Sequence, residues 1–277
     1  MTRSEAVRSF RALGGWGLAV AVFAAMLVLL PILMDPDSMR VNPVSRLRPP
    51  GADHPFGTDQ LGRDLLAMCL QGGRVSLLIG VSVAGLSLAV GTILGLLALF
   101  SRTSDALLMR LADGLMAIPA ILLAITLVSV FEAGIGNLVI ALAVPEIPRV
   151  MRIVRSAALA LRDSTFVEAA RMAGCGRLRV LVVHILPNTV PLLIVQGTYT
   201  IANAILVESG LSFIGLGVPA ETASWGRIIA EGRLFYQLFP YQVLIPGIML
   251  AALIYAVNVA GDRLRDSLDL RVAGGAR

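Results

Sequence analysis

Several uninterrupted apolar runs constrain this chain more than any other feature of its sequence. They cover residues 13–34, 75–100, 106–131, 135–157, 189–209 and 243–262. Each run reaches the roughly 20 residues that an α-helix needs to cross about 30 Å of hydrocarbon. Charged residues make up 15% of the chain and hydrophobic residues 57%, against about 25% and 45–50% in soluble domains. We therefore predict an all-α membrane protein with six transmembrane helices, and we exclude an ordinary water-soluble enzyme.

The first run, residues 13–34, has the length of a retained transmembrane helix. Arg3, Arg8 and Arg11 precede it, as basic residues do in a secretory signal peptide. At ~1.5 Å per residue, however, the run extends roughly 33 Å, and residues 31–35 contain no small-residue cleavage site. Because six spans is an even number, both termini are expected on one side of the membrane.

The distribution of arginine predicts which side that is. Arginine exceeds the acidic residues in segments 1–12, 100–110 and 149–187. Residues 35–74 instead hold five arginines and five aspartates, and residues 208–233 hold two arginines against Glu208, Glu221 and Glu231. The positive-inside rule then places both termini in the cytoplasm. The predicted parts are a cytoplasmic N-terminus (1–12), a first helix (13–34), a periplasmic loop (35–74), a five-helix core (75–262) with a cytoplasmic loop (158–187), and a cytoplasmic tail (263–277).

The composition also argues against several function classes. The net charge of +5 follows from topology, and no basic block is interleaved with stacking aromatics, so nucleic acid is not an expected partner. All 23 basic residues are arginines, which excludes a Walker A or Schiff-base lysine. Cys69 and Cys175 form no Cys-x-x-Cys pair and His54 and His184 are isolated. We therefore predict no metal site and no cofactor in this chain.

Residues 165–187 predict a short helix–turn–helix elbow on the arginine-rich side. Thr165 and Glu168 have the spacing of a capping box, and Gly174 suits the left-handed position that ends a helix. A second helix is expected to follow until Pro187 opens the next span. Its predicted apolar face consists of Leu178, Leu181, Val182 and Ile185. An elbow that is apolar on one face and rich in arginine on another suits the docking of a partner.

The same stretch resembles the EAA loop of ABC importer permeases, through Glu168-Ala169-Ala170, then Gly174, then Leu186-Pro187. Residues 54–64 (HPFGTDQLGRD), 210–217 (GLSFIGLG) and 261–266 (GDRLRD), with Arg74, Ser76, Trp225 and Gly226, are similar to the C-type subunit of dipeptide, oligopeptide and nickel permeases. The resemblance runs from about residue 50 to residue 271. The chain departs from the family pattern at Ala67-Met68, where relatives often carry Ser-Arg, and before Arg271, where proline is usual.

This resemblance implies a type I ABC importer permease core in a bacterial inner membrane, with no enzymatic activity of its own. The expected partners are a homologous B-type permease, two ATPase subunits that hold ATP and Mg²⁺, and a periplasmic or lipid-anchored binding protein. The residues expected to couple to the ATPase are Glu168, Ala169, Ala170, Gly174, Leu186 and Pro187. The outer-loop family motif consists of Gly57, Thr58, Asp59, Gly62, Arg63 and Asp64; its two open interpretations are folding of the loop and contact with substrate.

Polar residues within the predicted spans are candidates for the transport pathway. Gln196, Thr200 and Asn203 share one helix face, where they either hydrogen-bond between helices or line the pathway. Asn258 belongs to the same neutral set. Asp113 is costly in lipid and should face the bundle interior, where it either serves transport or pairs with Arg110 or Arg149. Gly91-x-x-x-Gly95 predicts close helix packing.

The resemblance favours dipeptides or oligopeptides as the cargo, and the neutral hydrogen-bonding groups of the spans suit an amide-rich solute better than a bare metal ion. Import of nickel or a nickel chelate by the same family is the first alternative. An intramembrane serine protease using Ser212 is a different class, but no histidine follows His184 to act as its base, and the spacing around Ser212 does not match G-x-S-x-G. A secondary transporter is less consistent with the sequence, since we find no internal repeat and few acidic residues within the spans.

Overall fold

The computed structural model describes Leu29, residues 40–132 and residues 134–274, with side chains up to residue 265. The predicted N-terminus (1–12) and first helix (13–34), Leu29 apart, lie outside the described residues. The described part is helical, with an isolated bridge between Thr58 and Asp64 as its one β contact. Its helices are α2 (Leu65–Leu97), α3 (Arg102–Met116), α4 (Ala120–Val130), α5 (Ile135–Arg162), α6 (Thr165–Met172), α7 (Arg177–Arg179), the π-helix η3 (Val180–Ile185), α8 (Leu186–Phe213), α9 (Trp225–Gly232) and α10 (Tyr241–Gly274), with short 3₁₀ turns at Pro43–Ser45 and Arg233–Phe235.

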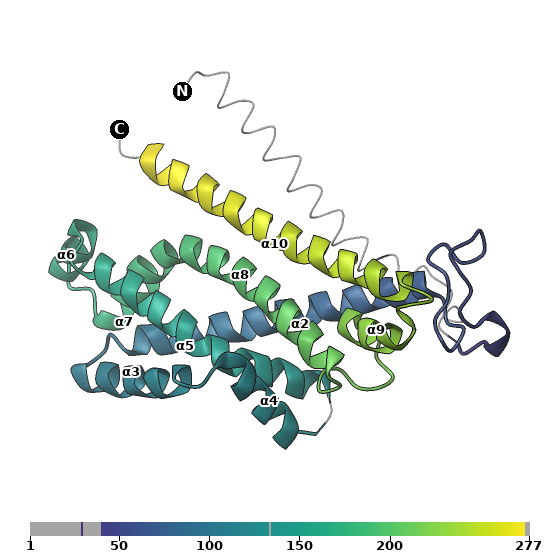
Figure 1. Ribbon diagram of the computed structural model, residues 1–277. Helices are drawn as coiled ribbons and strands as arrows, with labels where there is room; N and C mark the ends of the chain where they lie inside the picture. Colours follow the sequence, from purple (N-terminus) through teal and green to yellow (C-terminus); the bar gives the residue numbers. More distant parts are fainter. Residues whose placement is uncertain (1–28, 30–39, 133, 275–277) are drawn as a thin grey trace.

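The long helices α2, α5, α8 and α10 lie side by side in one bundle (Figure 1). Helix α6 lies at one end, here called the elbow end, and the segment 42–64 with α9 lies at the other, here called the loop end. By length and composition, three described helical runs could cross a membrane: Leu65–Leu97, Arg177–Phe213 and Tyr241–Arg265. The bent pair α3 and α4 qualifies if it counts as one span. The multi-span helical architecture is confirmed, whereas the predicted count of six is not.

The expected continuous span over 106–131 is wrong, because the structure has two helices there, bent by 87°. Helix α3 ends at Met116, and Pro119 occupies the N-cap of α4. Proline lacks a backbone N–H and disfavours helical geometry in the residue before it. Ile118-Pro119 therefore ends one helix and starts another in a new direction.

Two other helices extend beyond their predicted limits. Helix α2 begins at Leu65 rather than at 75, because the Asp64 side chain caps it by accepting from the Ala67 N–H at 3.1 Å. Helix α10 continues to Gly274 without ending at 262. The sequence patterns located the apolar centre of each helix but not its polar ends.

Close backbone packing joins α2 to α5, as the glycine pair predicts. A Cβ added at Gly91 would lie 2.6 Å from the Val150 Cβ, and one at Gly95 would lie 2.8 Å from the Met151 carbonyl oxygen. Only glycine fits such a contact without moving one helix. At the loop end, the fully buried Trp225 fixes α9 by donating from Nε1 to the Cys69 carbonyl oxygen at 2.7 Å.

Glu208 lies inside α8 and is fully buried, so its assignment to the loop 208–233 is wrong. Its carboxylate accepts hydrogen bonds from Ser76 Oγ of α2 at 2.8 Å and from Ser212 Oγ at 2.7 Å. Hydrogen bonds of this kind offset the cost of burying a carboxyl group. The apolar run can therefore continue as helix through the acidic residue as far as Phe213.

Candidate coupling elbow and translocation pathway

Helix α6 forms the first arm of the elbow, but its cap differs from the prediction. Ser164, not Thr165, occupies the N-cap position, and no side-chain cap hydrogen bond forms there. The Ser164 hydroxyl instead donates to the Leu161 carbonyl oxygen at 2.6 Å, so the capping box is wrong. Glu168 and Ala169 are exposed, whereas Ala170 is buried against the rest of the chain.

Gly174 ends this arm in the left-handed conformation that the sequence predicts, with φ +83. Its N–H donates to the Arg171 carbonyl oxygen at 2.9 Å, and the next N–H, of Cys175, donates to the Ala170 carbonyl oxygen at 3.1 Å. The pair of bonds closes the helix as a glycine C-cap does. A residue with a Cβ would be strained at this φ.

The second arm is continuous with α8, so Pro187 does not separate it from the next span. Between α7 and α8 the chain forms the π-helix η3, and Pro187 in the first turn of α8 supplies no N–H for a regular helical bond. The predicted apolar face is only half right. Leu181 and Ile185 are buried, but Leu178 is 63% exposed and Val182 is also exposed.

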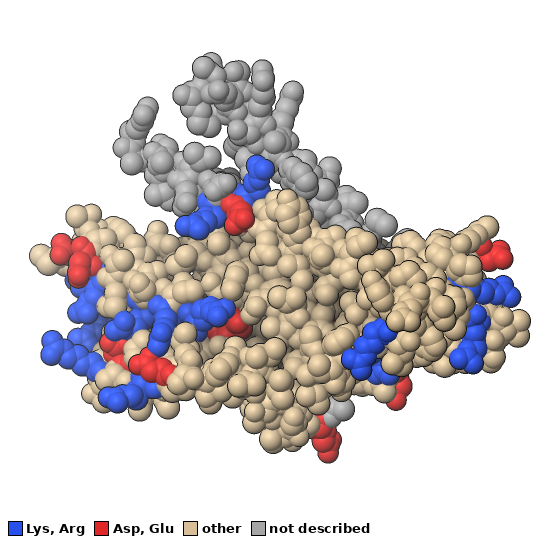
Figure 2. Space-filling view, in the orientation of Figure 1, with Lys and Arg blue, Asp and Glu red and all other residues tan. Residues whose placement is uncertain are grey.

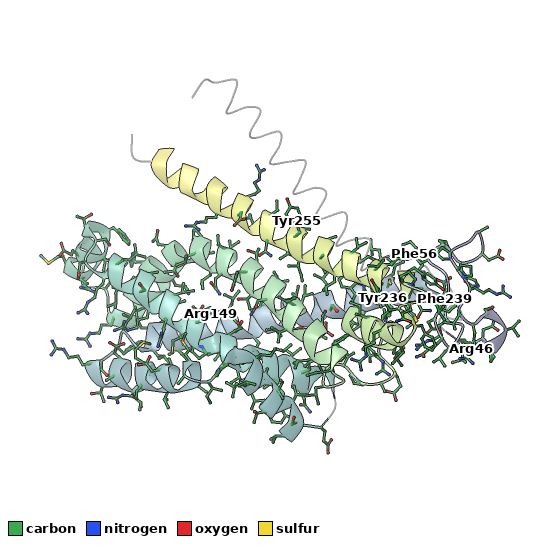
Figure 3. The ribbon with its side chains drawn as sticks, viewed as in Figure 1. Arg46, Phe56, Arg149, Tyr236, Phe239 and Tyr255 are labelled. Carbon is green, nitrogen blue, oxygen red and sulfur yellow. The ribbon has the colours of Figure 1, made fainter. Side chains whose placement is uncertain are left out.

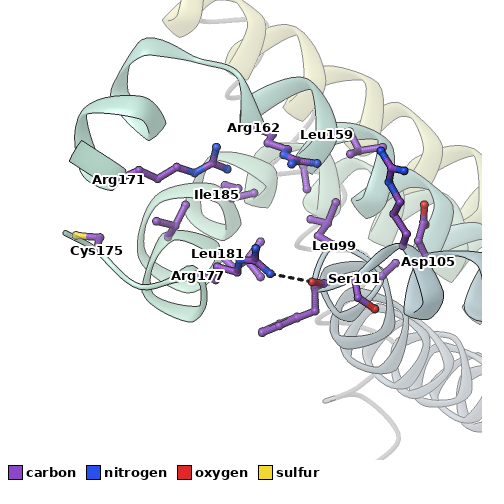
Figure 4. A pocket seen from close by; sticks show the side chains of 15 residues that line it. Leu99, Ser101, Asp105, Leu159, Arg162, Arg171, Cys175, Arg177, Leu181 and Ile185 are labelled. Atoms are coloured by element: carbon purple, nitrogen blue, oxygen red, sulfur yellow. Dashed lines mark hydrogen bonds between the residues drawn. The ribbon is translucent and has the colours of Figure 1, made fainter. Parts of the chain in front are cut away.

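The elbow presents apolar side chains outward and borders a cavity. Met172 is 90% exposed, and Phe166, Leu178 and Val183 are also exposed. Behind them, a cavity of about 640 Å³ lies between the elbow, the end of α2 and the start of α3 (Figure 4). Arg177 closes one wall by donating to the Phe100 carbonyl oxygen at 3.3 Å. Exposed apolar groups beside arginines suit contact with another protein.

Three arginines on one face of α5 each pair with a carboxylate. Arg149 pairs with Glu146, Arg152 with Asp113, and Arg155 with Asp105. These six residues are called the charged stripe below. The pairing of Asp113 with Arg152 overturns the expected pairing with Arg110 or Arg149. Asp113 is also 59% exposed within the described chain, so the bundle interior does not cover it.

The neutral candidate residues make two kinds of hydrogen bond, one between helices and the others within a single helix. Asn203 donates from Nδ2 of α8 to Glu146 Oε1 of α5 at 2.9 Å, which is the interhelical hydrogen bond that the sequence allowed. Gln196 donates to the fully buried Thr200 within α8 at 3.3 Å. Asn258 is exposed and donates to the Ile254 carbonyl oxygen of its own helix at 3.0 Å.

Glu146 is a site residue that the sequence pattern did not predict, and its partner Arg149 was counted in the arginine-rich segment 149–187. Glu146 lies between Pro145 and Pro148, inside α5, and it is buried. A small cavity of about 20 Å³, large enough for about one water molecule, adjoins Glu146 and Asn203 between α4, α5 and α8. The sequence does carry one sign of this pair: Glu146 and Arg149 are an acidic and a basic residue three positions apart in an otherwise apolar run.

The outer-loop motif is held by contacts within the loop end. Thr58 is fully buried and donates to the Ser45 carbonyl oxygen, while Asp59 accepts from Arg63 Nε at 2.6 Å. Arg63 also donates to Glu231 of α9 at 2.8 Å. Gly57 and Gly62 have positive φ, and Asp64 both caps α2 and contacts His54 Nδ1 at 2.7 Å. Each polar group thus has a partner in the fold of the loop.

Comparison with known sequences identifies relatives of this chain. Residues 87–274 match the family described as binding-protein-dependent transport system inner membrane component. A probable peptide ABC transporter permease protein of Sinorhizobium fredii is 46% identical over 89% of this chain and 84% of its own. A dipeptide transport system permease protein of Alkalihalophilus pseudofirmus is 37% identical over 91% and 83%, and a di/tripeptide transport system permease protein of Pseudomonas aeruginosa is 41% identical over 80% and 73%.

Solved structures share the architecture at lower sequence identity. A chain of the MetNI methionine ABC transporter in an inward-facing conformation aligns with a TM-score of 0.60 at 18% identity, covering 73% of this chain and 97% of that one. A chain of an amino acid ABC transporter aligns with a TM-score of 0.57 at 18% identity, covering 74% and 94%. Both support the type I permease fold. The chain therefore belongs to the family of binding-protein-dependent transport system inner membrane components.

Proposed function

We propose that this chain is one permease subunit of an ATP-driven importer of short peptides. The observation that carries the proposal is its similarity to peptide permeases over at least 80% of its length. Nickel import and intramembrane proteolysis are not favoured, because these relatives are all named as peptide permeases. The chain supplies part of a path through the membrane and makes or breaks no covalent bond.

The elbow is proposed to seat in a cleft of an ATPase subunit. Glu168, Ala169 and Gly174 are exposed on it, with Pro187 exposed nearby and Leu186 half-buried. A polar and apolar protrusion of this kind, at the end of the bundle that carries most arginines, suits a cytoplasmic partner (Figure 2). ATP and Mg²⁺ would reside on two such ATPase subunits, while a homologous second permease completes the pathway and a binding protein delivers the peptide at the loop end.

The proposal is tested with the assembled transporter in proteoliposomes that contain ATP on the ATPase side. The expected result is uptake of a radiolabelled dipeptide that requires the binding protein and ATP, with no competition by free Ni²⁺. A matched control complex carries an ATPase variant unable to hydrolyse ATP. Uptake of nickel without any uptake of di- to hexapeptides would refute the assignment.

A further inference from the structure

The cavity at the elbow end collects arginines that have no carboxylate partner within the described chain. Four arginines line it: Arg102, Arg162, Arg171 and Arg177. Arg177 donates to a backbone carbonyl oxygen, and the other three form no ion pair or side-chain hydrogen bond with the described residues. Asp105, the carboxylate in the lining, pairs with Arg155 instead. Contacts among the described residues therefore leave the positive charge of the cavity uncompensated.

This arrangement differs from that of the charged stripe, where each arginine contacts a carboxylate. Like charges around one cavity repel each other, most strongly where protein replaces water between them. Figure 4 shows Arg162, Arg171 and Arg177 around this cavity. Helix α3 begins at its edge with Arg102, and a helix N-terminus adds partial positive charge. The cavity therefore favours an anionic ligand, and guanidinium groups suit the oxygens of a phosphate.

The other walls of the cavity are apolar. They include Leu99, Phe100, Leu159, Val180, Leu181 and Ile185, of which the last three are buried. A volume of about 640 Å³ is in the range that holds an organic ligand. A small inorganic anion would leave the apolar walls exposed to water, which is unfavourable. The lining thus suits an amphipathic ligand, with its charge at the arginines and hydrocarbon against the walls.

The cavity also lies at one end of a helix that is long and apolar enough to cross a membrane. Residues 75–97 of α2 carry no charge and extend roughly 35 Å, against about 30 Å for the hydrocarbon core of a bilayer. The cavity begins directly after this stretch, at Ala98. At the opposite end, Figure 3 shows Tyr236 and Phe239 near the start of α10, where aromatic residues typically mark a membrane surface. The two membrane surfaces thus bracket α2, and the cavity lies at the surface on the elbow side.

We propose that the cavity binds the phosphate group of an anionic glycerophospholipid from the adjoining bilayer surface. The arginines hold the headgroup, and an acyl chain lies against the apolar walls. Basic pockets between membrane spans bind anionic headgroups in this way. The lining arginines belong to α3, α5, α6 and α7, so a bound phosphate connects the elbow to the bundle. The inference concerns lipid and does not depend on the cargo.

The test follows the reaction of Cys175, which lines the cavity and is half-buried, with a maleimide in the complete transporter in detergent micelles. Phosphatidylglycerol should slow this reaction, whereas phosphatidylcholine, whose choline balances its phosphate, should not. In the double variant Arg162→Gln/Arg171→Gln, the phosphatidylglycerol concentration that halves the rate should rise about tenfold to thirtyfold. The matched double variant Arg110→Gln/Arg179→Gln removes two exposed arginines outside the cavity and should leave that concentration unchanged.

Equal shifts in the two double variants, or no shift in either, would overturn the inference, because net charge rather than the cavity would then govern the lipid effect. If the cavity variant fails to assemble, Arg162→Gln and Arg171→Gln are measured singly, each with an expected shift of about fivefold. Slowing by glycerol 1-phosphate at the lipid's working concentration would assign the cavity to a soluble phosphate ester. A thiol that is unreactive in the lipid-free complex would assign it to a partner subunit. Either result overturns the lipid site.

Discussion

The contact between α2 and α5 allows one substitution to be evaluated from the structure. In Gly91→Ala the new Cβ would lie 2.6 Å from the Val150 Cβ and 2.7 Å from its Cγ1, where carbon atoms favour about 3.5–4.0 Å. Val150 is fully buried, and its Cβ is fixed to the backbone, so the helices must separate locally by about 1 Å. Overpacking of this kind costs about 1–3 kcal/mol, partly offset by about 1 kcal/mol of helix propensity.

We therefore expect Gly91→Ala to lower the free energy of unfolding by up to about 2 kcal/mol, and the thermal midpoint by about 2–4 °C for each kcal/mol. The measurement is thermal unfolding of the purified transporter in detergent, followed by intrinsic fluorescence. Gly85→Ala is the matched control, because Gly85 belongs to the same helix and has no atom within 4 Å of an added Cβ. A midpoint for Gly91→Ala equal to or above that of Gly85→Ala would refute the packing argument.

Three further predictions concern the elbow, the buried carboxyl group and topology. Gly174→Val should uncouple ATP hydrolysis from uptake, because the backbone φ of +83 at this position strains a residue with a Cβ. The matched control is Gly176→Val, where φ is -65 and no atom lies within 4 Å of an added Cβ, and it should leave coupling intact. Equal coupling in the two variants would argue against a coupling role for the elbow. Glu208→Ala should destabilise the transporter by about 2–4 kcal/mol, because two serine hydroxyls lose their hydrogen-bond acceptor. Glu208→Gln keeps an acceptor and should cost about half as much. Similar thermal midpoints for the two variants would contradict the role of Glu208 as the acceptor of these hydrogen bonds. A membrane-impermeant maleimide should label the half-buried Cys175 only from the cytoplasmic side and should spare the fully buried Cys69; labelling of Cys175 in intact cells would reverse the proposed orientation.

Hydropathy predicted the helices well where one apolar run corresponds to one helix. It placed the centres of α2, α8 and α10, and the glycine pair Gly91 and Gly95 correctly indicated close packing. It failed where a single residue changes the backbone direction. Pro119 divides an apolar run into two helices that are bent by 87°. A hydropathy average over about 20 residues does not detect the break that one proline makes in a helix.

The polar site was harder to predict because charge was interpreted as a sign of exposure. Glu208 was assigned to a loop, although hydroxyl groups from two helices compensate its burial. Arg149 was counted toward cytoplasmic charge, although it packs on the Tyr199 ring of α8 and pairs with the buried Glu146. Partners that lie far away in sequence decide both cases, and one sequence alone does not reveal them. Gly174 was predictable because its role depends on local backbone geometry.

The continuous helical run from Arg177 to Phe213 connects the second arm of the elbow to the loop end of the bundle. The run has 37 residues and measures about 55 Å along its axis. Near its far end, a Cβ added at Gly226 would lie 2.0 Å from the Ser209 carbonyl oxygen, and one at Gly217 would lie 2.0 Å from Ser212 Oγ. Because these contacts leave no room between α8 and α9, a rotation of the helix at the elbow should also move α9 at the loop end.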